Sequence, residues 1–354
     1  MDVQDRVRGC LLGGAIGDAL GAPIEFQSLR DIRREHGAEG VAGYVTTWRG
    51  RTGLITDDTQ MTLFTVEGLL NARAAHASRP GGRGPGGTRA ASDAVRQAYL
   101  RWLDTQNHPG PPPADRPHRT GPLREEGWLY SRRAPGNACL SGLGRPFPGP
   151  SPFGEPGPVN PRSKGCGTVM RSAPFGFMTV SAAGPPGSEE AFELAAVCAQ
   201  ITHGHPTGYL AAGAFAAIVA RLMAGDALEP AVYHALHLLA AYPAHDETSA
   251  ALRAALTLAQ AEGGHSPERV ESLGGAWVAE EALAIGVYCA LAEPSVERAM
   301  LLSVNHSGDS DSTGSVCGNL LGALHGPSAL PEPWLRPLEG RTTIDRLATA
   351  AAAP

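Results

Sequence analysis

Apolar residues recur at helical spacing along most of this chain. Within 95–102 they fall at i, i+3, i+4 and i+7, as one face of a helix requires. Other segments rich in Ala and Leu have a similar texture; they are 6–20, 191–198, 206–223, 228–241, 246–262, 276–291, 293–304 and 315–325. Such runs, without clusters of β-branched residues, favour helix over strand. Alternating strand patterns are scarce, and the best, 43–48, is brief, so we predict an all-α fold.

Two stretches rich in Gly and Pro interrupt this helical texture. The chain has 45 Gly and 30 Pro among 354 residues, which predicts long loops. We expect a flexible insertion near 76–90 and another near 108–120, inside a longer stretch, 108–161, of the kind that is often functional. The first is not a phosphate loop, because it lacks the Gly-Lys-Ser/Thr ending and a preceding strand. No internal boundary or repeat divides the chain, so we predict a single domain, 1–354.

Charge and cysteine usage exclude several classes of protein. The formal net charge of −6 argues against a general nucleic-acid binder, which would carry a basic stripe. None of the six cysteines lies within three residues of another, so a CxxC zinc or redox pair is excluded. No apolar run reaches about 18 residues, and 1–6 lack the pattern of a signal peptide. We therefore expect a cytoplasmic protein that does not bind membranes.

The first acidic motif is Thr56-Asp57-Asp58-Thr59, directly before an apolar helical segment. Thr56 is typical of a helix N-cap. Two acids in a first turn have a simple explanation, which is to complement the helix dipole. The alternative is a metal site, because adjacent aspartates and hydroxyls concentrate the oxygen ligands that hard divalent cations prefer.

The second acidic motif lies in 305–314, where Asp309 and Asp311 are separated and followed by hydroxyl residues. Its start resembles a calcium-binding loop, but the twelfth position is Leu320, where an EF-hand needs a bidentate Glu. A surface turn remains the simple explanation. If the two motifs met, four carboxylates would converge, and they could stay ionised together only with cations, such as two divalent ions about 4 Å apart. The sequence alone does not show that they meet.

Two further motifs have both a structural and a functional interpretation. In the predicted helix 6–20 and directly after it, Gly14, Gly17 and Gly21 share one helix face. Such a face serves either close helix packing or leaves room for a ligand. The same region carries Asp18, and Glu25 follows it. The turn 163–167 is either a plain turn or an anion site built from backbone N–H groups at the start of a helix.

The segment Thr202-His203-Gly204-His205-Pro206 contains two histidines between two predicted helices. Paired histidines are typical ligands of transition metals. Because the acidic motifs are the better candidates for a metal site, we interpret these histidines as helix-capping or ligand-packing residues.

In their order and content, these motifs resemble those of the ADP-ribosylglycohydrolase family. The matching stretches are Gly13-Gly14-x-x-Gly17-Asp18-x-x-Gly21, Thr56-Asp57-Asp58-Thr59, Gly165-Cys166-Gly167-x-x-Met170-Arg171, Thr202-His203-Gly204-His205 and Gly308-Asp309-Ser310-Asp311-Ser312-Thr313. They span 6–326, nearly the whole chain, and the departures are mostly insertions that delete no motif.

The resemblance implies a compact, orthogonal multi-helix bundle with two divalent cations, Mg²⁺ or alternatively Mn²⁺. The implied metal ligands are Thr56, Asp57, Asp58, Asp309, Asp311 and Ser312. Glu25 falls where some members carry a catalytic glutamate on a mobile loop. The implied substrate-binding residues are Ser163, Gly165, Cys166, Gly167 and His203, with the turn at the diphosphate and the histidine near the adenosine.

The implied reaction is hydrolysis of the bond between ADP-ribose and a modified side chain, with arginine as the first choice of acceptor and with release of ADP-ribose. We expect Asp57 or Asp58 to transfer a proton beside the metals and Glu25 to act as a gate or base. Alternatives are an ADP-ribosyl-serine or ADP-ribosylated nucleic-acid hydrolase, a two-metal phosphoesterase that releases AMP, and a non-catalytic ADP-ribose-binding protein. The expected partners are an ADP-ribosylated protein and a cognate ADP-ribosyltransferase.

Overall fold

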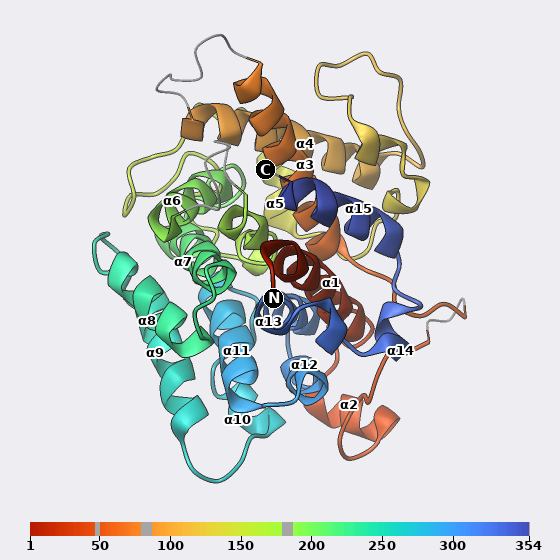
Figure 1. Ribbon diagram of the computed structural model, residues 1–354, viewed down its shortest axis with the longest axis vertical. Helices are drawn as coiled ribbons and strands as arrows, with labels where there is room; N and C mark the ends of the chain where they lie inside the picture. The colour runs from red at the N-terminus through yellow and green to blue at the C-terminus, as the bar shows by residue number, and fades with distance from the viewer. Residues whose placement is uncertain (47–49, 79–86, 179–186, 354) are drawn as a thin grey trace.

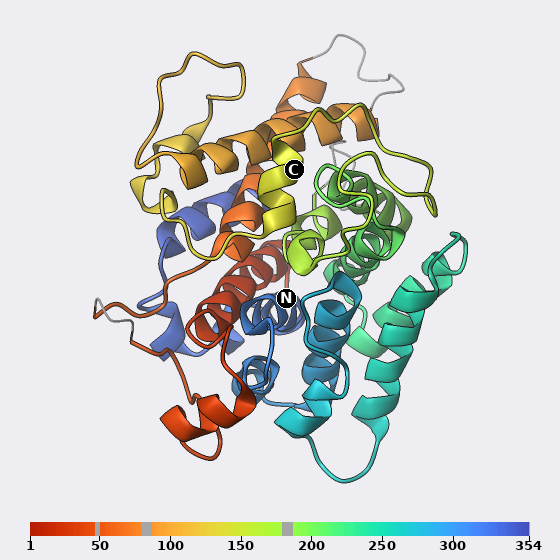
Figure 2. The same cartoon turned by 180° about the vertical axis from the view of Figure 1, so that it is seen from behind.

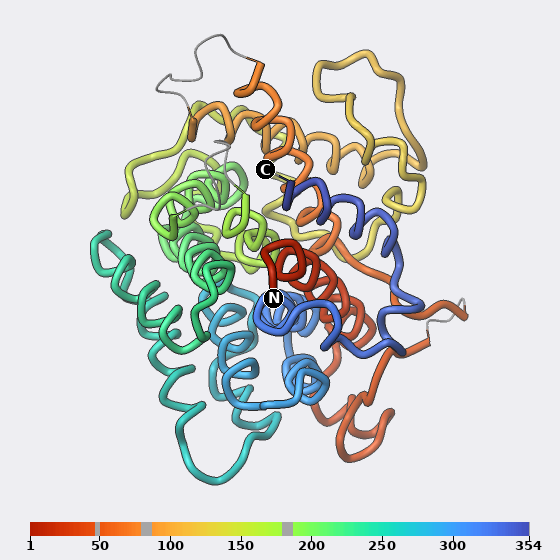
Figure 3. The backbone as a smooth tube through the Cα atoms, viewed as in Figure 1, coloured from red at the N-terminus to blue at the C-terminus, as the bar shows by residue number. Residues whose placement is uncertain are grey.

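The prediction of an all-α fold is confirmed by the computed structural model, which describes residues 1–46, 50–78, 87–178 and 187–353 (Figures 1 and 3). Over these ranges the chain forms fifteen α-helices and five short 3-10 helices. No strand forms in them, and one isolated antiparallel bridge pairs Gly165 with Val278. In the brief candidate strand, 43–46 are irregular, and 47–48 lie outside the described residues.

The α-helices are α1 (Val3–Gly21), α2 (Leu29–His36), α3 (Asp57–Ala77), α4 (Gly87–Asn107), α5 (Asn137–Leu143), α6 (Ser188–Ala199), α7 (Pro206–Met223), α8 (Leu228–Leu239), α9 (Asp246–Gln260), α10 (Pro267–Glu271), α11 (Ala279–Ala292), α12 (Val296–Val304), α13 (Ser310–His325), α14 (Glu332–Leu335) and α15 (Arg341–Ala352). The 3-10 helices are η1 (Pro122–Glu125), η2 (Gly127–Leu129), η3 (Cys166–Thr168), η4 (Ala173–Gly176) and η5 (Pro327–Ala329). The predicted segment 206–223 coincides with α7. The helix predicted at 315–325 begins five residues earlier, at Ser310, because the side chain of Asp309 caps it.

Helices α1 and α13 lie side by side in the middle of the molecule (Figures 1 and 2). Their backbones touch through glycines: Gly9, Gly13 and Gly17 on α1, and Gly314, Gly318 and Gly322 on α13. A methyl group at Gly17 would lie only 1.9 Å from the carbonyl oxygen of Gly314. Gly14 and Gly21 also face α13, so close helix packing, rather than room for a ligand, explains the predicted glycine face.

Helix α7 forms part of the core that surrounds this pair. It is the one helix of the described ranges long and apolar enough to cross a membrane, and 94% of it is buried inside the protein. A central helix of a folded core has the same composition, because it is apolar on every side.

Loops rich in Gly and Pro join α3, α4 and α5. The segment predicted as an insertion at 76–90 begins and ends in helix, since α3 ends at Ala77 and α4 starts at Gly87, and 79–86 lie outside the described residues. The tract 108–120 is fastened to α4 by Arg119, whose guanidinium pairs with Asp104 at 2.9 Å and with Asp115 at 2.5 Å. Flexibility of this tract stays a prediction.

Candidate active site

The two acidic motifs, about 250 residues apart in sequence, meet at one cavity of about 370 Å³. Asp57 and Asp58 form the first turn of α3, whose N-cap is Thr56 as predicted. Asp309 caps α13, and Asp311 lies in the first turn of that helix with Ser312. The α1–α13 contact and the packing of α3 on both helices bring these helix starts together. Every predicted metal ligand except Thr56 lines the cavity.

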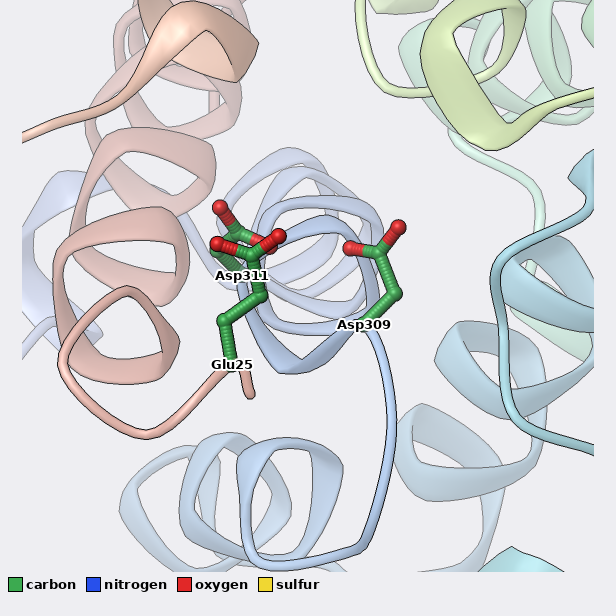
Figure 4. Close-up of side chains that lie close together, drawn as sticks. All are labelled: Glu25, Asp309 and Asp311. Carbon is green, nitrogen blue, oxygen red and sulfur yellow. The ribbon is translucent and has the colours of Figure 1, made fainter. Parts of the chain in front are cut away.

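Glu25 joins the acidic cluster from the turn between α1 and α2. Oxygens of Glu25, Asp309 and Asp311 all lie within 4.8 Å of one another, and all three side chains are buried (Figure 4). The close-up shows the Glu25 carboxylate reaching over the start of α13 beside that of Asp311, with Asp309 facing them. The glutamate is therefore close enough to act at the same centre as the aspartates.

The chemistry of this donor set fits divalent cations. Five carboxyl groups line the cavity, and its lining among the described residues contains no Lys or Arg to balance them. One oxygen of Asp58, Oδ2, is buried and has no hydrogen-bond partner within the described parts of the chain. Buried carboxylates without a partner are costly, and oxygen-coordinated cations such as Mg²⁺ and Mn²⁺ remove that cost.

Burial and mutual repulsion raise the pKa values of these carboxyl groups in the protein without cations. Burial raises the pKa of Asp57 to about 8, with smaller contributions from Asp18 and Asp309. The pKa of Glu25 also rises to about 8, because of burial first and then the charges of Asp309, Asp57 and Asp18. The pKa values of Asp58 and Asp311 lie well above the usual range for the same two reasons.

We predict that Mg²⁺ stabilises the protein more at pH 8 than at pH 5. The raised pKa values mean that the folded, metal-free protein retains protons that the unfolded chain loses above about pH 4, so the stability that these groups contribute declines as pH rises toward 8. Cations displace those protons, and we expect a gain in melting temperature on the order of 5 °C at pH 8 from millimolar Mg²⁺. The measurement is thermal unfolding with MgCl₂ against NaCl of equal ionic strength. An equal or absent Mg²⁺ effect at the two pH values would contradict the assignment.

Asp18 organises the start of α3 from beneath. Its carboxylate accepts hydrogen bonds from the backbone N–H and the hydroxyl of Thr56, and from the backbone N–H and the hydroxyl of Thr59. The hydroxyl of Thr56 also accepts from the Asp58 N–H at 3.3 Å. Thr56 is thus held beneath the cavity rather than in its lining, and its role as a metal ligand stays a prediction.

The turn 163–167 forms another wall of the cavity, with Ser163, Gly165, Cys166 and Gly167 in its lining. The helix expected after the turn is only the three-residue η3, so a helix dipole contributes little here. The Cys166 N–H donates to the carbonyl of Trp277. Within the described ranges, the N–H groups of Gly165 and Gly167 have no acceptor. Two such donors suit a diphosphate. Binding of the diphosphate by this turn stays a prediction.

The two histidines of the predicted pair do different things. Nδ1 of His205 accepts a hydrogen bond from the Thr207 N–H at 3.2 Å, so His205 caps α7. His203 lines the cavity. The capping interpretation is therefore confirmed for His205, and the ligand-packing role of His203 stays a prediction.

Sequence reasoning missed two parts of the cavity wall. Residues 134–138 line it from the long Pro- and Gly-rich stretch, and the Gly136 N–H donates to Oδ2 of Asp57 at 3.2 Å. The length of that stretch was the only signal. The second part is an aromatic pair, Phe26 and Trp277, whose rings stack at 5.7 Å although both are exposed. Lone aromatic residues in irregular segments give no periodic signal.

The chain belongs to the ADP-ribosylglycohydrolase family, whose model matches residues 1–353. Members of this family are hydrolases, and divalent metal use is known among them.

Several relatives match almost the whole chain at low identity. The ADP-ribosyl-[dinitrogen reductase] glycohydrolase of Rhodospirillum rubrum is 25% identical, and the match covers 95% of this chain and 91% of that protein. The ADP-ribosylhydrolase ARH3 of Bos taurus is 25% identical over 97% and 91%, and the ADP-ribosylarginine hydrolase Tri1 of Serratia proteamaculans (strain 568) is 24% identical over 97% and 78%. A solved structure described as an ADP-ribosylglycohydrolase-related protein complex has the same fold, with a TM-score of 0.61 and 24% identity over 99% of this chain and 98% of that one.

Proposed function

We propose that this protein is a hydrolase, dependent on two divalent cations, that removes ADP-ribose from modified arginine side chains. One observation carries the proposal: the starts of α3 and α13, the turn 163–167 and His203 share one cavity. The acids suit a ribose held through its hydroxyls, and the turn suits a diphosphate. Arginine is the acceptor in the printed name of the relative from Serratia proteamaculans.

The roles of the residues follow from their positions. Asp57, Asp58, Asp309 and Asp311, with Thr56 and Ser312, would hold the cations, which neutralise these carboxylates and polarise the hydroxyl oxygens of the bound ribose. The side chains of Ser163, Cys166 and His203 and the backbone of Gly165 and Gly167 would hold the rest of ADP-ribose.

Hydrolysis breaks the bond between the anomeric carbon of the ribose and the guanidine nitrogen, and a water oxygen replaces that nitrogen. The departing nitrogen needs a proton, and the proposed proton donor is Asp57 or Asp58. Glu25, from the turn after α1, acts as a gate or as the base that takes the proton from the water. The position of both side chains supports these roles, because Asp57 and Glu25 are buried and line the same cavity.

We predict release of intact ADP-ribose from ADP-ribosylated arginine peptides, with Mg²⁺ or Mn²⁺ present and not in excess chelator. Matched peptides carrying ADP-ribosyl-serine test the acceptor, and chromatography of the products separates ADP-ribose from AMP. Release of AMP would identify a phosphoesterase. Preference for serine would identify an ADP-ribosyl-serine hydrolase, and ADP-ribose binding without turnover would identify a non-catalytic member.

The proposed setting is a reducing cytoplasm, where the protein opposes a cognate ADP-ribosyltransferase that modifies the same target. All six cysteines are free thiols, as expected in such a compartment.

A further inference from the structure

A buried arginine lies directly behind the cavity. The Arg171 side chain is 1% exposed, and its guanidinium lies over the ring of Tyr99, 4.5 Å from the ring centre. Its Nη1 contacts the sulfur atoms of Met61 and Cys139, and none of these partners is a carboxylate. Its Nη2 donates a hydrogen bond of 2.6 Å to the Thr202 hydroxyl. The only oxygen in this set of side-chain contacts is therefore that of Thr202.

The distances around the Thr202 hydroxyl indicate the direction of the next hydrogen bond. A guanidinium can only donate, so the Thr202 oxygen accepts from Arg171 and still has its own hydrogen to place. Oγ1 of Thr202 lies 2.8 Å from Nδ1 of His203 and 3.4 Å from the carbonyl oxygen of Ala199. That carbonyl already accepts the backbone N–H groups of Thr202 and His203. The hydroxyl hydrogen therefore goes to Nδ1, which must be unprotonated to accept it.

The other nitrogen of the ring then carries the proton. A neutral imidazole has one N–H, so an accepting Nδ1 places the hydrogen on Nε2. Nε2 has no hydrogen-bond partner in the described parts of the chain, although His203 is 2% exposed and lines the cavity. The ring lies against the turn 163–167: a methyl group at Gly165 would be 3.2 Å from Nε2. A donor without a partner in the described parts of the chain thus belongs to a side chain that lines the cavity.

We infer that Arg171 and Thr202 are positioning residues that hold His203 as the neutral tautomer protonated on Nε2, and that this N–H donates to an acceptor atom in the adenosine diphosphate part of the ligand. The tautomer stands on the hydrogen bonds alone, and the ligand contact rests on the proposed function. The neutral imidazole of His203 thus offers the ligand an N–H donor that carries no positive charge.

The electrostatic surroundings support the neutral form. Burial, and then the positive charge of Arg171, lower the pKa of His203 to about 3. Burial also raises the pKa of the Cys139 thiol, which the Arg171 guanidinium contacts. The same cavity is lined by carboxyl groups, among them Asp57 and Glu25, whose pKa values rise to about 8 in the protein without cations. Neither His203 nor Cys139 changes charge between pH 5.5 and 8, so the donor is expected to persist over that range.

Nitrogen-15 NMR of the histidine-labelled protein tests the tautomer without any variant. The His203 resonances are assigned by their loss in His203→Gln. We expect an unprotonated Nδ1 and a protonated Nε2 throughout pH 5.5–8. A proton on Nδ1, or titration of the ring within this range, would overturn the inference.

Calorimetric titration with ADP-ribose, in saturating Mg²⁺, tests the consequence for binding. Thr202→Val keeps the shape but removes the hydroxyl, and we expect about tenfold weaker binding from the loss of one oriented hydrogen bond. Thr202→Ser keeps the hydroxyl and should bind within about twofold of the parent. Equal affinity of the Val variant and the parent would overturn the positioning role. Failure of the parent itself to bind ADP-ribose would overturn the proposed function and the ligand contact, while the NMR result would still decide the tautomer.

Discussion

Replacing Asp309 by Asn is expected to lower kcat/KM for an ADP-ribosylated arginine peptide by about a thousandfold and to weaken Mg²⁺ binding. Asp309 faces Glu25 and Asp311, and its carboxylate is one of the oxygens available to the cations (Figure 4). Loss of a negatively charged ligand removes several kcal/mol of stabilisation of the transition state, and about 1.4 kcal/mol corresponds to each tenfold change in rate.

The fold should survive this substitution. Asp309 also caps α13 by accepting the N–H of Ser312, and Asn caps a helix about as well as Asp. A matched control is Asp246→Asn, because the side chain of Asp246 is 93% exposed at the start of α9. Circular dichroism and thermal unfolding check the fold, and calorimetric titration checks Mg²⁺ affinity. Parental turnover in the Asp309 variant would remove Asp309 from the proposed metal centre.

Replacing Gly17 by Ala is expected to reduce the free energy of unfolding by about 3 kcal/mol, the upper end of the usual cost of overpacking. The added methyl group would lie 1.9 Å from the Gly314 carbonyl oxygen and 2.2 Å from its carbon. Backbone atoms cannot rotate away, so α1 and α13 must separate. Asp18, which follows Gly17 directly, holds the start of α3, and Asp311 lies one helical turn before Gly314 in α13. Separation of the two helices would therefore move the acids of the site, so activity should fall together with stability.

Gly87→Ala serves as the control, because a methyl group there, at the start of α4, meets no atom of the described residues within 4 Å. Ala has the higher helix propensity, so this control should leave stability unchanged or slightly increased. Urea unfolding of both variants gives the comparison. If the Gly17 variant were as stable as the control, the backbone contact between α1 and α13 would not be as tight as the structure shows.

Local features of the sequence predicted much of the fold. Helical periodicity identified α7 with its bounds and the positions of α8, α9, α11 and α12 to within a few residues. Thr56 was identified as a cap because capping depends only on residues two or three positions away. Helix α13 begins earlier than the predicted 315–325, since Asp309, for which a surface turn was the simple explanation, caps it.

Some parts of the candidate site could be predicted from the sequence, and others could not. The acidic motifs and their preference for divalent cations could be inferred from side-chain chemistry. Periodicity could not identify the wall formed by 134–138, because an irregular segment has no repeating pattern and its contact with Asp57 spans 79 residues. The same holds for the hydrogen bond from Arg171 to Thr202, although both residues lie in recognisable motifs.

The sequence by itself determined which segments are helical, where several of them begin, and which side chains offer oxygen ligands, because these properties depend on neighbours within about one helical turn. Only the tertiary structure decided that the starts of α3 and α13 meet, that the glycines of α1 serve helix contact rather than a ligand, and that Arg171 stands behind His203. The physical reason is that each depends on how closely two distant backbones approach, and that distance is set by packing across the whole core.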